Sequence, residues 1–178
     1  MKRWQKFTFG LLGLMAVLLS AGWLLPAHQR VERSVVTSGK PADVYNLAAS
    51  LRRWAEWTAW TTNRFPDLTM RFDGPDAGTG AVMIASGKSS GDGTVKITAA
   101  EPADGITYTL DFNHGTQLFT GAIRFTNTPG GLRVTWTLDA DLGVNPLKRW
   151  TGLAMGSLMG GDMEQGLANL QRKVESKP

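Results

Sequence analysis

"GITYTLDFNHGTQLFTGAIRFTNTPGGLRVTWTLDA", residues 105–140, contains three segments in which apolar and polar side chains alternate. Alternation of this kind places successive side chains on opposite faces of a β-strand. The connections "NHG" and "TPGG" are rich in glycine and suit tight turns between antiparallel neighbours. The stretch therefore predicts three consecutive strands of an antiparallel sheet with one apolar face. The residues predicted on that face are Ile106, Tyr108, Leu110, Phe112, Phe119, Gly121, Ile123, Phe125, Leu132, Val134, Trp136 and Leu138.

Similar segments extend the predicted sheet towards the N-terminus. They are "VERSVVTS" (31–38), "LTMRFDG" (68–74), "GAVMIASG" (80–87) and "GTVKITAA" (93–100). "PADVYNLAASLRRWAEW" (41–57) predicts one helix after the first strand, because its apolar residues have helical spacing. A long C-terminal helix is predicted from Asn145 as N-cap, with an interruption or bend at Gly160-Gly161 and Asp162 as a new cap. This order predicts an α+β domain in which a curved antiparallel sheet wraps around the C-terminal helix.

The first thirty residues have a different character. Lys2, Arg3 and Lys6 precede the uncharged segment 7–25, which as a helix would be about 28 Å long, close to the thickness of a bilayer's hydrocarbon core. We expect residues 1–6 to be a cytoplasmic n-region, 7–25 a transmembrane signal-anchor helix, 26–30 a linker and 31–178 the folded domain. The early positive charges favour a cytoplasmic N-terminus, hence a domain on the periplasmic (extracytoplasmic) side of the inner membrane. A cleaved signal peptide is the alternative.

Composition excludes several classes of site. The chain has no cysteine, and its two histidines, His28 and His114, cannot by themselves make a zinc site. Its net charge of +4 equals the four basic residues at positions 2, 3, 6 and 30, so the remainder is balanced and has no basic stripe for nucleic acid. The common nucleophile, zinc-protease and phosphate-loop motifs are absent. We therefore expect no metal, no cofactor and no nucleic-acid partner, and the candidate proton carriers are Tyr108 and His114.

Three tryptophans recur at intervals of three in "LRRWAEWTAW" (51–60). On a helix, steps of three residues spread the rings over about 120°, so they cannot all have the same role. We predict that Trp54 packs in the core, whereas Trp57 and Trp60 line or close a cavity. Contact with a lipid surface is a second interpretation, because Arg52 and Arg53 lie beside the rings.

Three stretches of the chain carry a family resemblance: "VERSVVTSGKPADVYNLAASLRRWAEWTAW" (31–60), "GTGAVM" (78–83) and "GDMEQGLANLQR" (161–172). Together they resemble the START-like (SRPBCC) superfamily, in particular its branch described as polyketide cyclase/dehydrase and lipid transport. The resemblance implies a helix-grip fold, in which a seven-stranded antiparallel sheet grips a long C-terminal helix around a hydrophobic tunnel. Members bind lipids, sterols, polyketides or other apolar molecules, and some are enzymes. The branch has no shared catalytic motif.

The sequence thus predicts a membrane-anchored protein that binds an apolar, lipid-like molecule between sheet and helix. The small residues among the methionines of the last helix do not fill the space under a curved sheet, so we expect a cavity there. Flexible methionine side chains suit ligands of variable shape. An enzyme acting on a polyketide or cyclic apolar substrate and a ligand-free structural or interaction domain are the alternatives. Ligand identity, pathway, protein partners and oligomeric state are not predicted. The predicted cavity residues are Trp57, Trp60, Met70, Met83, Tyr108, Phe112, Phe119, Trp136, Met155 and Met159.

Overall fold

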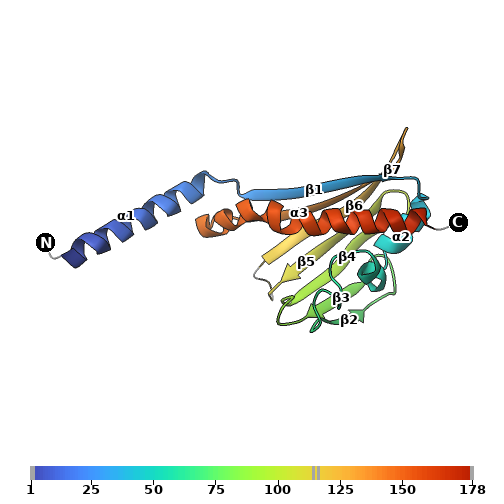
Figure 1. Ribbon diagram of the computed structural model, residues 1–178, viewed down its shortest axis with the longest axis horizontal. Helices are drawn as coiled ribbons and strands as arrows, with labels where there is room; N and C mark the ends of the chain where they lie inside the picture. Colours follow the sequence, from blue (N-terminus) through green and yellow to red (C-terminus); the bar gives the residue numbers. More distant parts are fainter. Residues whose placement is uncertain (1–2, 114, 116, 177–178) are drawn as a thin grey trace.

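The centre of the molecule is a seven-stranded sheet with the order β1-β7-β6-β5-β4-β3-β2, in which all neighbouring strands are antiparallel. The computed structural model describes residues 3–113, 115 and 117–176. The predicted α+β class and the sheet–helix arrangement are confirmed, because the long helix α3 (Pro146–Glu175) lies over the sheet, mainly along β1 (Figure 1). The strands are β1 His28–Thr37, β2 Thr69–Asp73, β3 Val82–Ser86, β4 Gly93–Glu101, β5 Gly105–Phe112, β6 Gln117–Thr128 and β7 Gly131–Asp141.

The core lies between one face of the sheet and the helices. Along β5, Ile106, Tyr108 and Leu110 are buried, as alternation predicts, and they meet the buried residues of β6 and β7. Leu167 and Leu170 of α3 close this core from the other side. Burial of this continuous apolar face is the main force that holds sheet and helix together.

The helix predicted for residues 41–57 is wrong in its second half. Helix α2 (Pro41–Ala48) ends early, and a separate 3₁₀-helix, η1 (Leu51–Glu56), follows it. The break leaves backbone carbonyls at the end of α2 without helical partners. Two tryptophans satisfy them, because the indole N–H of Trp54 donates to the oxygen of Ala48 (2.9 Å) and that of Trp57 to the oxygen of Leu47 (3.3 Å).

Helix α3 is continuous, so the predicted interruption at Gly160-Gly161 is wrong. Its start is as predicted, because the side chain of Asn145 accepts a hydrogen bond from the backbone N–H of Leu147 (2.9 Å). Gly160 serves a close approach instead of a break, since a Cβ at this position would overlap the guanidinium of Arg33.

Helix α1 (Arg3–Leu24) leads away from the domain at the end where α3 begins (Figure 1). The indole N–H of Trp150 donates to the oxygen of Leu18 (3.0 Å), and Nη1 of Arg149 donates to the oxygen of Trp23 (2.9 Å). Among the residues that the structure describes, no helix combines the length and the apolarity needed to cross a membrane. The predicted linker 26–30 is shorter than expected, because β1 begins at His28.

Candidate functional site

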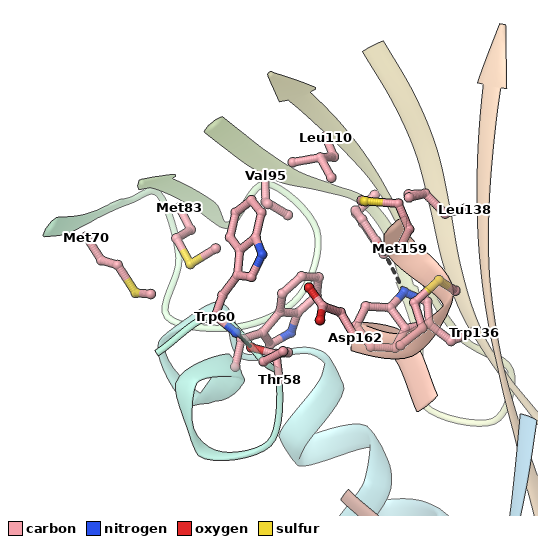
Figure 2. Close-up of a pocket in the computed structure, with 14 residues that line it drawn as sticks. Thr58, Trp60, Met70, Met83, Val95, Leu110, Trp136, Leu138, Met159 and Asp162 are labelled. Atoms are coloured by element: carbon pink, nitrogen blue, oxygen red, sulfur yellow. Dashed lines mark hydrogen bonds between the residues drawn. The ribbon is translucent and has the colours of Figure 1, made fainter. Parts of the chain in front are cut away.

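A small, almost wholly apolar cavity lies where η1, the inner face of the sheet and the middle of α3 meet. Its volume is about 70 Å³, room for a few water molecules and well below the roughly 300–1,000 Å³ of typical small-molecule sites. In Figure 2 the ring of Trp60 reaches towards Val95, with Met83 on one side and Asp162 on the other. The lining residues are Trp54, Thr58, Ala59, Trp60, Met70, Met83, Val95, Tyr108, Leu110, Trp136, Leu138, Met159, Asp162 and Met163.

A hydrogen-bonded aromatic pair forms the polar part of this inner cavity. The indole N–H of Trp136 donates to the hydroxyl oxygen of Tyr108 over 2.7 Å, and both side chains are buried. Tyr108 faces Gly121 on the neighbouring strand, where a Cβ would overlap its ring, so the glycine makes room for the tyrosine. Burial raises the pKa of the Tyr108 hydroxyl well above its ordinary value. The hydroxyl therefore stays protonated and can donate one hydrogen bond to an acceptor in the cavity.

One carboxylate lies at the edge of the inner cavity. Asp162 of α3 accepts a hydrogen bond from Nη1 of Arg64 (2.6 Å), and both side chains are partly exposed. The pair connects the segment after η1 to α3. Because its charge is already paired, Asp162 is better suited to holding this segment over the cavity than to proton transfer.

A larger groove of about 460 Å³ lies between the first half of α3 and the adjoining ends of β6 and β7. Met159 lines both this groove and the inner cavity, so its side chain stands between the two. A row of ring contacts also links them: Trp60 to Phe112 (5.2 Å between centroids) and Phe112 to Phe119 (6.0 Å). The groove is lined by Gly115, Gln117, Leu118, Phe119, Ala140, Asp141, Leu142, Leu147, Lys148, Thr151, Gly152, Met155, Leu158 and Met159.

The structure divides the predicted cavity residues among three places. The inner cavity is lined by Trp60, Met70, Met83, Tyr108, Trp136 and Met159. Phe119 and Met155 line the groove, together with Met159. Trp57 and Phe112 line neither: Trp57 is fully buried against Trp136 and caps α2, and Phe112 packs between Trp60 and Phe119.

Several lining residues were not predicted as such. Trp54, predicted to pack in the core, is buried there and also reaches the inner cavity, and Asp162, predicted as a helix cap, lines its edge. Leu110 and Leu138 belong to the predicted apolar face of the sheet, so the alternation of apolar and polar residues already indicated that they point inward. His114 lies outside the described residues, and within those described no group of three or more potential ligand side chains could hold a metal ion.

The lipid-contact interpretation is wrong for two of the three tryptophans of residues 51–60. Trp54 and Trp57 are buried. Arg52 pairs with Asp76 (3.1 Å), and Arg53 pairs with Glu56 (2.9 Å), so these arginines are held in local ion pairs. Trp60 is partly exposed, but its ring packs against Phe112 (5.2 Å between centroids) and lines the inner cavity.

Comparison with known proteins agrees with this architecture. The model of the family described as polyketide cyclase / dehydrase and lipid transport matches residues 28–175. No curated protein matches the chain.

Solved structures with the same fold include protein CV1439 from Chromobacterium violaceum, with 16% identity, a TM-score of 0.59, and coverage of 84% of this chain and 99% of that one. The di-domain ARO/CYC StfQ of the steffimycin biosynthetic pathway has 14% identity and a TM-score of 0.63, and the match covers 85% of this chain and 52% of StfQ. Ara h 8.0201 has 15% identity and a TM-score of 0.58, with coverage of 84% and 99%. At these identities the likeness concerns the fold.

Proposed function

Since this chain belongs to the polyketide cyclase/dehydrase and lipid transport family, we propose that it binds an apolar small molecule or lipid between α3 and the sheet. The observation that carries the proposal is the position of Met159, which lines both the groove of about 460 Å³ and the inner cavity of about 70 Å³. The methionine side chain is unbranched and flexible, so it can change rotamer to open one space into the other. The groove alone has the volume of a typical small-molecule site.

The ligand expected here has an apolar body and at least one hydrogen-bond acceptor. Phe119, Met155 and Met159 offer apolar walls to the body. At the inner end, Tyr108 keeps its proton because burial raises its pKa, and its oxygen already accepts from Trp136. A carbonyl, ether or hydroxyl oxygen of the ligand is the natural partner for the remaining O–H.

Binding is favoured over catalysis by the chemistry of the described lining residues. Tyr108 is a poor base at neutral pH with its raised pKa, and the Asp162 carboxylate is paired with Arg64. If the protein is nevertheless an enzyme, Tyr108→Phe should abolish turnover of an apolar cyclic substrate while leaving its binding largely intact.

Native mass spectrometry of the full chain in detergent, after incubation with a lipid extract, tests binding directly. We expect an additional apolar mass that denaturation releases. Met159→Trp should reduce uptake, because a larger rigid ring would block the connection between the groove and the inner cavity. Gln165→Trp places the same ring at an exposed position of the same helix and should leave uptake unchanged. A folded protein that stays empty with every extract would refute the proposal.

A membrane tether is part of the same proposal. Residues 7–25 carry no charge, three basic residues precede them, and in the structure Leu14, Val17 and Leu24 of α1 are exposed. Such a surface needs an apolar partner, and we propose the inner membrane, with the domain on its periplasmic side. Alkaline phosphatase fused after residue 30 should be active, and an inactive fusion would place the domain in the cytoplasm.

A further inference from the structure

Large apolar side chains are exposed around the opening of the groove. Leu118 at the start of β6 is 60% exposed, and Leu147 and Leu158 of α3 are 61% and 71% exposed, although all three line the groove. Val144, just before α3, is 76% exposed and lies beside Leu118 in an adjoining depression. These four residues are called the rim below.

The rim continues along the first half of α3. Leu147, Trp150, Ala154 and Leu158 follow one another at intervals of three or four residues, so they share one side of the helix. Leu153, on the same half of the helix, is also more than half exposed. The first half also buries Met155, whereas Met163, Leu167, Leu170 and Val174 of the second half supply most of the helix's buried side chains. The exposed apolar residues of α3 are therefore concentrated in its first half.

Helix α1 adjoins this surface. Its C-terminal part contacts the start of α3, since the Trp150 indole N–H donates to the oxygen of Leu18 and the Arg149 guanidinium donates to the oxygens of Trp23 and of Leu25, just after the helix. The exposed leucines of α1 and the rim therefore belong to one end of the molecule, opposite the end at which α3 finishes (Figure 1).

The charges within the first half of α3 have one sign. No acidic residue occurs between residues 142 and 161, whereas Lys148 and Arg149 lie beside Leu147. Asp141, at the end of β7, also lines the groove, and its carboxylate is 3.7 Å from Nδ1 of His28. Exposed leucine and tryptophan on a helical segment whose own charges are all basic are the pattern of helices that lie in the surface of an anionic bilayer.

We propose that the rim and the first half of α3 dock onto an anionic lipid bilayer, so that the groove opens directly into the membrane. The docking deepens the proposed function, because a ligand could then pass between bilayer and groove without crossing water. An anionic lipid surface is the occupant that fits, because Lys148 and Arg149 lie among the exposed leucines of α3 and the proposed tether α1 ends beside them.

The absence of cysteine from the natural chain allows a clean test. Leu158→Cys places a single environment-sensitive fluorophore on the rim of the full chain, and Thr126→Cys places the same label at an exposed position towards the other end of β6. Both labelled proteins are reconstituted into phosphatidylcholine vesicles with or without phosphatidylglycerol, and a quencher is attached to the lipid acyl chains.

In vesicles that contain phosphatidylglycerol, we expect the label at position 158 to shift its emission to the blue and to lose at least half of its intensity to the lipid quencher. The label at 126 should change little. Quenching at 158 should weaken without phosphatidylglycerol, and also in a Leu147→Glu background, where the exposed position 147 lets the protein remain folded.

Two results would overturn the proposal. One is an unquenched, water-exposed label at 158 in a protein whose circular dichroism shows that it is folded. The other is a label shielded from water but not quenched by lipid, in a protein of dimeric mass, which would assign the rim to a second copy. Ligand uptake in detergent uses no vesicle, so its failure would count against the groove and not against docking.

Discussion

Tyr108→Phe removes one oxygen from the interior and is the sharpest perturbation of the inner cavity. The oxygen accepts the hydrogen bond of the Trp136 indole N–H over 2.7 Å, and Tyr108 is only 2% exposed. Without it the indole N–H is left buried with no partner in the protein, which costs about 1–3 kcal/mol of the free energy of unfolding. Because phenylalanine keeps the ring, its contact with Trp54 (5.2 Å between centroids) should persist, and the loss should be that of the hydrogen bond alone.

Urea unfolding of the full chain in mild detergent, followed by tryptophan fluorescence, measures this loss. The midpoint should fall while the slope of free energy against urea stays the same, since the surface exposed on unfolding is unchanged. Tyr45→Phe is the matched control: Tyr45 is partly exposed, so its hydroxyl can bond water, and its loss should change stability by less than about 0.5 kcal/mol.

A double-mutant cycle isolates the pair. Trp136→Phe removes the donor, so the double variant leaves neither polar group unsatisfied and should be more stable than the sum of the single losses predicts, by about 1 kcal/mol or more. If Tyr108→Phe costs no more than the Tyr45 control, a water molecule in the cavity has taken over the hydrogen bond. The expectation that the Trp136 indole N–H is left without a partner would then be refuted.

Three further outcomes are expected. Gly121→Ala should destabilise the protein by about 1–3 kcal/mol in the same urea assay, because the new methyl group overlaps the Tyr108 ring and must displace it. In an alkaline titration followed by tyrosinate absorbance, Tyr108 should stay protonated while the chain is folded, because burial raises its pKa. Its contribution to stability is complete below the unfolded value of about 10 and decreases at higher pH, and ionisation of Tyr108 without unfolding would contradict this. Glu56, bonded by Arg53 and also paired with Lys173, has its pKa lowered to about 2, so its contribution is present above its ordinary value of 4.5 and is lost as the pH falls towards 2. Glu56→Gln should reduce the loss of unfolding free energy between pH 4.5 and about 2 by less than about 1 kcal/mol, because the ion pair is partly exposed. If that loss is unchanged in the variant, the ion pair contributes nothing.

The strands were predictable because their information is local. In β5, the residues 105–112 alternate in polarity and are bounded by turn residues, and the observed strand has the predicted bounds. The same alternation placed Tyr108 and Trp136 on the inner face, where they line the cavity. In a half-buried strand every second side chain faces the core, so the sequence itself shows which residues are buried.

The helix break at residues 49–50 was not predictable in the same way. Residues 41–57 keep a helical pattern, and the chain turns because Ser50 bonds the oxygen of Asp76 and two indole N–H groups bond the end of α2. The break shifts the helical phase, which is why Trp54 reaches the cavity and Trp57 is buried beside it. Asp162 was misassigned for a similar reason, because its partner Arg64 is distant in the sequence.

The glycine pair of α3 illustrates the limit of propensity. Glycine is a poor helix former, and two in succession suggest a break. At Gly160, however, the helix passes so close to the guanidinium of Arg33 that a Cβ would displace it, so a tertiary contact favours glycine within a continuous helix.

The position of β1 at one edge of the sheet has a consequence for how the protein is made. β1 (His28–Thr37) pairs only with β7, and β7 begins at Gly131, so on the order of 90 residues must be translated between the two. At roughly 5–20 residues per second the nascent β1 waits about 5–20 s for its partner, longer than local hairpins need to form. The ribosome must therefore deliver the chain as far as β7 before the first strand is paired, and until then Val31 and Val35 lack their partner strand.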